Sequence, residues 1–177
     1  MEEGFKLIEA RSYNEAIKLF TEIVQKDSSN LEALNGLAQA CYGAGDLPRA
    51  FQNYELSLNK DPSQSGIWVA YGNLFYNQGN SKKAAKSYRQ AIKYDSTHVR
   101  GLNNLAMVLK DLRDYDEAET YFLKAIYFDS TYSLAMRNLG DIYLKQQKTE
   151  KAILWLEKAR IADPKSLYGL YLSLIHI

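Results

Sequence analysis

Side chains that could carry chemistry are scarce in this chain of 177 residues. It contains one cysteine, Cys41, and two histidines, His98 and His176. A single cysteine cannot form an internal disulfide, and neither histidine belongs to a histidine–carboxylate arrangement with the spacing of a metal site or a catalytic triad. Cys41 stands in an apolar column, where a free cysteine behaves as a small buried hydrophobe. We therefore expect no metal, no cofactor and no enzymatic activity.

Charge and hydropathy also exclude several classes of partner. The 22 basic and 21 acidic side chains give a net charge of +1, which offers no overall reason to expect nucleic acid or an anionic membrane. No apolar run approaches the roughly 18 residues of a membrane span, and the start of the chain lacks the features of a signal peptide. Five cations do cluster, and we expect them either to form a solvated outer face or to meet an acidic partner: Lys82, Lys83, Lys86, Arg89 and Lys93.

The sequence repeats itself every 34 residues, and this period determines the architecture. An alanine recurs at that interval, at Ala16, Ala50, Ala84, Ala118 and Ala152. Four residues after each alanine stands a large side chain: Phe20, Tyr54, Tyr88, Phe122 and Leu156. A further column is small, at Gly4, Ala38, Gly72, Ala106 and Gly140. Columns that stay in register over five periods without an insertion are the mark of a repeat protein.

Within each period the apolar residues fall at helical spacing. Leu102, Leu105 and Leu109 lie at i, i+3 and i+7, on one face of a helix. Polar or glycine-containing breaks divide each period into two such stretches, and Ser12 and Asp114 stand where they would cap the second helix in a capping box. Each period is therefore predicted to fold as two antiparallel helices of about a dozen residues joined by a short turn.

A helix–turn–helix period of 34 residues resembles the tetratricopeptide repeat. The third period carries that family's signature at Trp68, Tyr71, Gly72, Phe75, Gly79, Ala84, Tyr88 and Ala91. The resemblance implies an all-α, right-handed α-solenoid of about eleven helices. It makes residues 1–177 a single array, with repeats at about 1–30 (partial), 31–64, 65–98, 99–132 and 133–166 and a lone final helix from about 166.

Stacked repeats bury one continuous core, because no single unit can bury its apolar face alone. The small residue of each first helix is predicted to let the second helix approach closely. The large residues then fill the space between successive pairs. We expect five aromatic residues in this core: Trp68, Tyr71, Phe75, Tyr88 and Phe122.

In the resembling family, the first helices line the inside of a curved superhelix, where peptides often bind. Residues of the first helices outside the core columns are expected to face this concave groove: Asn35, Gln39, Tyr42, Val69, Asn73, Tyr76, Arg100, Asn103, Asn104, Met107, Arg137, Asn138 and Asp141. Asparagine offers both a donor and an acceptor to a peptide backbone, and Asn104 and Asn138 resemble two rungs of an asparagine ladder. Tyr42 and Tyr76 are predicted to flank an apolar ligand side chain. The alternative is that these side chains are solvated or pack between repeats.

One subset of the family binds chaperone carboxyl termini through a clamp of lysine, asparagine and arginine. The corresponding positions here are Asn35, Gln39, Ala70, Arg100 and Asn104, of which Arg100 alone is cationic. We therefore expect no carboxylate clamp of that kind.

The predicted function is a non-catalytic scaffold that binds a protein or peptide in the concave groove. The alternative is a recognition or regulatory segment of a larger enzyme or of a secretion or assembly protein, because the chain opens partway into a helix. For the same reason we expect the true N-terminus to be missing, so localisation stays open, with the cytoplasm as the default. The C-terminal residues are apolar and uncapped, which predicts a docked final helix or, alternatively, self-association; residues 173–177 break the repeat pattern and are expected to pack little.

Overall fold

Ten α-helices and no strand make up residues 1–165, the part of the chain that the computed structural model describes. The helices are α1 (Glu2–Glu9), α2 (Tyr13–Lys26), α3 (Leu31–Gly43), α4 (Leu47–Lys60), α5 (Ser65–Asn77), α6 (Ser81–Tyr94), α7 (Val99–Asp111), α8 (Tyr115–Phe128), α9 (Ser133–Lys145) and α10 (Thr149–Ala162). The expected final helix from about residue 166 and the tail at 173–177 lie outside the described residues. The all-α class is confirmed.

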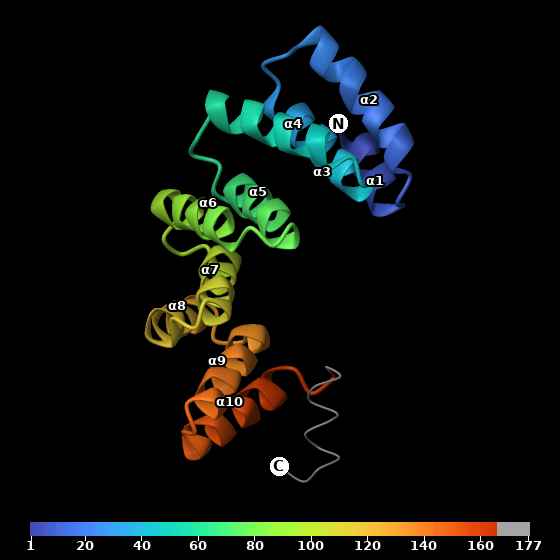
Figure 1. The fold of residues 1–177 in the computed structure, drawn as a ribbon. Coiled ribbons are helices and arrows are strands. Elements are labelled where there is room, and N and C mark those ends of the chain that lie inside the picture. The colour runs from blue at the N-terminus through green and yellow to red at the C-terminus, as the bar shows by residue number, and fades with distance from the viewer. Residues whose placement is uncertain (166–177) are drawn as a thin grey trace.

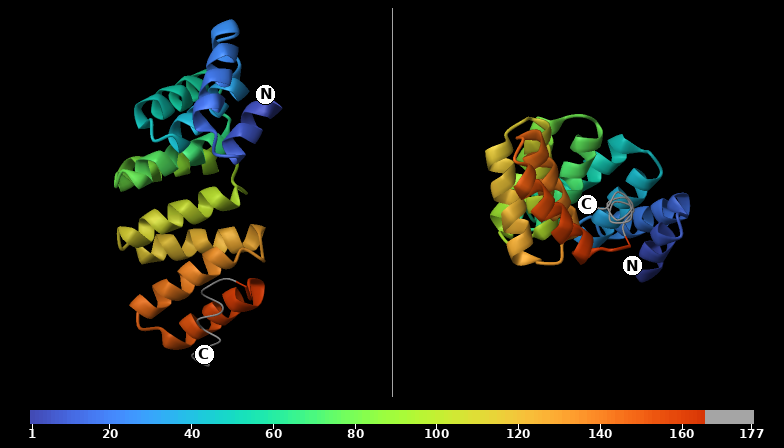
Figure 2. Two further views of the ribbon diagram at one scale, coloured as in Figure 1. Left: turned by 90° about the vertical axis from the view of Figure 1, so that its right-hand side faces the viewer. Right: turned by 90° about the horizontal axis from the view of Figure 1, so that it is seen from below.

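The helices form antiparallel pairs that stack along one direction. Figure 1 shows α1 and α2 at one end of the stack and α9 and α10 at the other. Successive pairs are rotated relative to one another, as the two views in Figure 2 show. The architecture is the right-handed α-solenoid that the family resemblance implies, and α1, α3, α5, α7 and α9 are the first helices of its repeats.

A residue in the left-handed backbone conformation closes the turn inside every pair. The five residues stand 34 apart, with φ of 59° at Arg11, 82° at Gly45, 74° at Gly79, 65° at Arg113 and 60° at Gln147. Glycine adopts this conformation freely, whereas a residue with a Cβ atom is strained in it. The turn geometry is thus constant along the array, although only two of its turns have the residue best suited to it.

Polar side chains begin several helices. Asp114 caps α8 by accepting a hydrogen bond from the backbone N–H of Glu117, and the His98 side chain caps α7. Ser12 stands at the N-cap of α2 but makes no capping hydrogen bond, so the capping box expected there is wrong. The N-cap position could be read from the sequence, but the rotamer of the capping side chain could not.

The loops between repeats share one local structure. In each, an aspartate accepts hydrogen bonds from the backbone N–H and the hydroxyl of the residue two positions later: Asp27 from Ser29, Asp61 from Ser63, Asp95 from Thr97 and Asp129 from Thr131. These hydrogen bonds lower the pKa of all four carboxyl groups. Each helix pair is therefore connected to the next by the same ordered turn.

The two helices of a pair cross where a small residue meets a large one. A Cβ atom added at Gly72 would lie 2.6 Å from the ring of Tyr88, and one added at Gly4 would lie 2.5 Å from the ring of Phe20. The Phe20 ring also meets the next pair, where a Cβ atom added at Gly36 of α3 would lie 2.5 Å from it. Carbon atoms do not approach so closely without a shift of one group. The absent side chains therefore set how near the helices come, as the small and large columns predict.

The buried core divides into two clusters that meet at α5. One cluster is built from α1 to α4 and includes Leu74 of α5, and the other runs from α5 to α10 and includes Val69. The two sides of α5 therefore belong to different clusters, and this helix joins the halves of the array.

The aromatic residues expected in the core differ in how deeply they are buried. Tyr88 and Phe122 are buried, as expected, with 1% and 0% of their surface exposed. Trp68, Tyr71 and Phe75 pack against the core clusters but are only partly buried, so the expectation of a core position is confirmed only in part for these three. The reason is that a hollow between α5 and α6 opens over them.

Exchanging residue types in the left-handed column tests the cost of that conformation. Arg113→Gly should raise the free energy of unfolding by about 1 kcal/mol, because it relieves the strain of an L-residue. Gly79→Arg, at the matching position one repeat earlier, should lower it by a similar amount, since open space surrounds Gly79 and only the backbone strain changes. Urea unfolding followed by circular dichroism measures both values, and changes of equal sign would contradict the explanation.

A pair of glycine substitutions within α5 tests the helix crossing. Gly72→Ala should lower the free energy of unfolding by about 1–3 kcal/mol, because the added methyl group overlaps the buried Tyr88 ring. Gly66→Ala is the matched control in the same helix: the nearest outside atom, on His98, lies 3.9 Å from the added Cβ. Since alanine is the better helix former, this control should stabilise by up to about 1 kcal/mol. Equal effects of the two substitutions would refute the crossing argument.

Candidate functional site

A large hollow opens beside α5, on the face where the resemblance predicts the concave groove. It measures about 670 Å³ and lies between α3 and α5, with one residue of α1 at its edge. Its walls are formed by Phe5, Leu31, Glu32, Asn35, Gln39, Tyr42, Tyr54, Gln64, Gly66, Ile67, Ala70, Asn73 and Leu74. Four expected groove residues, Asn35, Gln39, Tyr42 and Asn73, are brought together here. Its apolar walls and Gln64 were not predicted.

Side-chain amides form the polar part of this hollow. The Asn35 Nδ2 atom donates a hydrogen bond of 2.8 Å to Oε1 of Gln64, and Gln64 Nε2 donates one of 2.9 Å to the backbone oxygen of Asp61. These bonds tie α3 to the loop between α4 and α5. The Oδ1 atom of Asn35 is buried and has no hydrogen-bond partner among the described residues. Gln39 is exposed, so the hollow contains both a buried and an exposed amide group.

A second, smaller hollow of about 140 Å³ lies between α5 and α7. It is lined by Asn73, Tyr76, Tyr88, Asn104 and Met107. The Oδ1 atom of Asn73 accepts hydrogen bonds from the Tyr88 hydroxyl at 2.7 Å and from Asn104 Nδ2 at 3.0 Å. Burial raises the pKa of Tyr88, which keeps its hydroxyl protonated as a donor. The Tyr88 ring packs against Gly72 while its hydroxyl reaches the groove, so core and groove are directly connected.

Two of the expected groove asparagines are buried. Asn103 is fully buried and donates to Asn104 Oδ1 at 3.1 Å and to the Met107 sulfur, so its expected place on the groove surface is wrong. Asn138 is 4% exposed, and its Oδ1 accepts a hydrogen bond of 2.9 Å from Lys110 Nζ. Asn104 and Asn138 thus each bond to the preceding first helix, which makes the two rungs part of the packing between repeats.

Tyr42 and Tyr76 also connect neighbouring first helices. The Tyr42 hydroxyl accepts a hydrogen bond from Asn77, and the Tyr76 hydroxyl donates one of 2.7 Å to Asp111. Both contacts span 35 residues, from one repeat to the next. The bond to Asp111 raises the pKa of Tyr76 to about 12. Each ring nevertheless lines a hollow, Tyr42 the larger and Tyr76 the smaller.

The groove becomes more charged along α7 and α9. Arg100 is exposed at the start of α7, while Lys110, Arg137 and Asp141 are half-buried. Burial raises the pKa of Asp141, although the neighbouring cations act to lower it, and burial lowers the pKa of Lys110. Sequence reasoning missed Lys110, which stands one period after Tyr76 and could have been found by extending that column.

Other kinds of site were also considered. No group of three or more histidine, cysteine, aspartate and glutamate side chains within residues 1–165 is placed to hold a metal ion. Cys41 is fully buried, and burial raises the pKa of its thiol. None of the described helices has the length and apolar character needed to cross a membrane.

Known sequences resemble this chain over most of its length. Sequence models of the tetratricopeptide repeat match residues 7–52, 72–113 and 98–160. The chain is 28% identical to a probable UDP-N-acetylglucosamine–peptide N-acetylglucosaminyltransferase SPINDLY of Hordeum vulgare, over 86% of this chain and 17% of that protein. It is 28% identical to a DnaJ homolog subfamily C member 7 homolog of Dictyostelium discoideum, over 90% and 33% of the two chains. The type IV pilus assembly protein PilF of Pseudomonas aeruginosa is 32% identical over 58% and 42%. The chain thus spans less than half the length of each of these relatives.

Solved structures share the architecture. MamA superposes with a TM-score of 0.82 at 19% identity, covering 93% of this chain and 96% of that chain. PilF of Pseudomonas aeruginosa superposes with a TM-score of 0.86 at 18% identity, covering 99% and 82%. YrrB, described as a TPR protein with an unusual peptide-binding site, gives 0.76 at 19% identity, covering 96% and 88%. At such identities the likeness shows the fold alone.

Replacing Asp141 by asparagine tests the electrostatics of the charged end. Because the pKa of Asp141 is raised, its carboxyl group holds a proton more tightly in the folded chain than in the unfolded chain. Protonation of Asp141 therefore stabilises the fold. This stabilisation is complete below the ordinary pKa of 3.8 and is lost as the pH rises through the folded pKa. We therefore expect Asp141→Asn to be more favourable, relative to the parent chain, at pH 7 than at pH 3. Asp95→Asn is the control of opposite sign, since the pKa of Asp95 is lowered. Urea unfolding over a pH series would contradict this if the Asp141→Asn difference stayed constant.

Proposed function

This chain belongs to the tetratricopeptide repeat family, and on that premise we propose that its concave groove binds an extended segment of a protein partner without chemistry of its own. The hollow of about 670 Å³ between α3 and α5 carries the proposal, because it combines amide groups with apolar walls on facing helices. Four of its lining residues, Asn35, Gln39, Tyr42 and Asn73, are ones that the family resemblance assigns to the concave face.

The lining of the hollow suits an extended peptide. Gln39 presents a donor and an acceptor to a peptide backbone, whose N–H and C=O groups need both. The buried Oδ1 of Asn35 has no hydrogen-bond partner, and an unpaired buried acceptor costs free energy. A ligand N–H that reached this atom would remove that cost. Leu31 and Ile67 offer apolar contact to ligand side chains, and Tyr42 offers an aromatic ring.

Names of relatives support a protein-binding role in general terms. YrrB is described by its peptide-binding site, and PilF by pilus assembly. The alternative that this chain is the recognition or regulatory segment of a larger enzyme or assembly protein draws on the same comparison, since it matches 17% of a transferase and 42% of PilF. In both cases the groove would bind the partner, so the same groove residues would be needed under either proposal.

Self-association through the C-terminal end stays a prediction. The apolar residues that suggested it lie outside the described residues. Within the described part, Ile153, Leu154 and Ile161 of α10 are exposed to between 48% and 65%.

A matched pair of tryptophan substitutions tests binding in the groove. Peptides are selected from a random phage-displayed library on the full chain, and their affinities are measured by fluorescence anisotropy. Gln39→Trp fills the hollow from an exposed position and should weaken the selected peptides by tenfold or more. Gln52→Trp makes the same change at an exposed position of α4 outside the hollow and should leave affinity within twofold.

Melting temperatures of the two variants provide the folding control, since both substitutions are made on exposed helix positions. A library that yields no binding peptide, or peptides that bind Gln39→Trp as tightly as the parent chain, would disprove groove binding.

A further inference from the structure

The side of α5 that turns away from the groove differs from its counterparts in the other repeats. Trp68, Tyr71 and Phe75 stand in three core columns and are all partly exposed. The nine residues of the same columns in repeats two, four and five are buried: Leu34, Leu37, Cys41, Leu102, Leu105, Leu109, Met136, Leu139 and Tyr143. Repeat three alone thus combines large aromatic residues in these columns with an uncovered surface.

These aromatic residues form the floor of an outer hollow of about 370 Å³. Phe51 of α4 borders the floor on one side, with its ring centroid 4.8 Å from that of Phe75 and 5.7 Å from that of Tyr71. The Trp68 indole N–H donates a hydrogen bond of 2.8 Å to the backbone oxygen of Pro62, which fixes its ring. The floor is therefore preformed, and it is wide enough for a large side chain.

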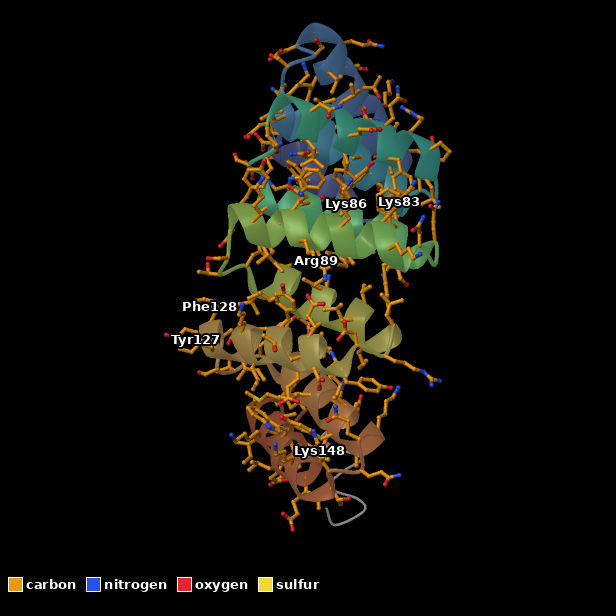
Figure 3. All side chains as sticks on the ribbon, turned by 60° about the vertical axis from the view of Figure 1, so that its left-hand side comes forward. Lys83, Lys86, Arg89, Tyr127, Phe128 and Lys148 are labelled. Atoms are coloured by element: carbon orange, nitrogen blue, oxygen red, sulfur yellow. The ribbon has the colours of Figure 1, made fainter. Side chains whose placement is uncertain are left out.

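Lysine side chains of α6 form the rim of this hollow. Lys83 Nζ lies 5.2 Å from the centroid of the Phe75 ring, and Lys86 also lines the hollow. Figure 3 shows Lys83 and Lys86 on one edge of α6 and Arg89 on the other, and Arg89 is paired with Glu117 at 2.8 Å. The α6 segment contains no acidic residue, so neither rim lysine has a carboxylate neighbour within its own helix.

One acidic group lies close to the floor on the α4 side. Glu55 faces the Tyr71 hydroxyl closely enough to add to the rise in the pKa of Tyr71 that burial causes. The rim is nonetheless cationic, because Lys83 and Lys86 make no ion pair in the described structure and repeat three as a whole carries five basic residues against one acidic residue.

We propose that this outer hollow is a second binding site, for an acidic protein segment that carries one large apolar side chain. The apolar side chain packs on the Trp68, Tyr71 and Phe75 floor, and flanking carboxylates meet Lys83 and Lys86. The site and the groove hollow share no lining residue of α5, so it requires a partner or a segment other than the one in the groove. The cationic rim is confined to α6 and the neighbouring repeats are net acidic, which favours a short acidic segment over a nucleic acid backbone.

Charge reversal at the rim provides the test. Random phage-displayed peptides are selected on the full chain after removal of those that bind a Lys83→Glu/Lys86→Glu variant. The groove is intact in that variant, so groove-binding peptides are removed and the outcome is independent of the proposal for the groove. The enriched peptides should be acidic with an aromatic or aliphatic anchor, and should bind the variant at least tenfold more weakly than the parent chain.

The matched control reverses two other exposed lysines of the same helix. Lys82→Glu/Lys93→Glu changes the net charge equally but leaves the residues that line the hollow in place, so affinity should change less than threefold. In a Trp155→Phe background Trp68 is the sole tryptophan, and bound peptide should reduce its quenching by iodide. Unchanged quenching would place the peptide elsewhere and overturn the proposal.

Other outcomes would also overturn it. Failure to enrich any peptide, or enrichment of peptides without net negative charge, would show that the hollow has no such ligand. Tight binding of a 12-nucleotide oligouridylate that is lost in Lys83→Glu/Lys86→Glu would reassign the site to nucleic acid. A dimer in light scattering that becomes a monomer in the same variant would reassign it to a second copy of the chain.

Discussion

The structure depends on the close contact between a large side chain of each second helix and a small residue of the first. The Phe20 ring lies against Gly4 of its own pair and Gly36 of the next, so one side chain sets the spacing both within a repeat and between repeats. Tyr88 extends this constraint to the groove, because its ring meets Gly72 while its hydroxyl holds Asn73. The positions of the groove amides therefore follow from the packing of the core. Because the contacts where the two helices of a repeat cross are tightly packed, the groove is preorganised for a ligand.

Helix α5 is where this regular packing changes. Large aromatic residues replace smaller core residues, the two core clusters meet there, and hollows open on both of its sides. In a stack where each repeat contacts only its neighbours, the junction with the least shared core is the one most easily altered by a ligand. A ligand in either hollow would contact α5 directly, so both proposed sites act on the helix that joins the two halves of the array.

The sequence predicted the helices and their crossings well because a 34-residue period constrains both. It predicted single side chains less well, since a column gives the face of a helix but not how closely the next helix approaches. Val69 and Asn103 share a column that was expected to face the groove, and both are buried, so that expectation is wrong for both residues. The apolar side chain of Val69 was the indication in the sequence that this position faces the core. For Trp68 the error was the opposite one: it was expected in the core but is partly exposed. No pattern within its own repeat indicates that a hollow opens over it.

Hydrogen-bond satisfaction determines where a groove ligand gains most. A ligand that displaces an existing bond, such as that between Asn104 and Asn73, only exchanges one partner for another, and the net gain from a hydrogen bond is about 0.5–1.5 kcal/mol even when it is new. A buried acceptor without a partner has no bond to lose. The Oδ1 atom of Asn35 is in that position at the wall of the hollow of about 670 Å³, whereas the unpaired Oδ1 of Asn103 lies in a fully buried side chain. Affinity should therefore concentrate between α3 and α5, and the asparagines of α7 and α9 should serve mainly to hold successive repeats in register.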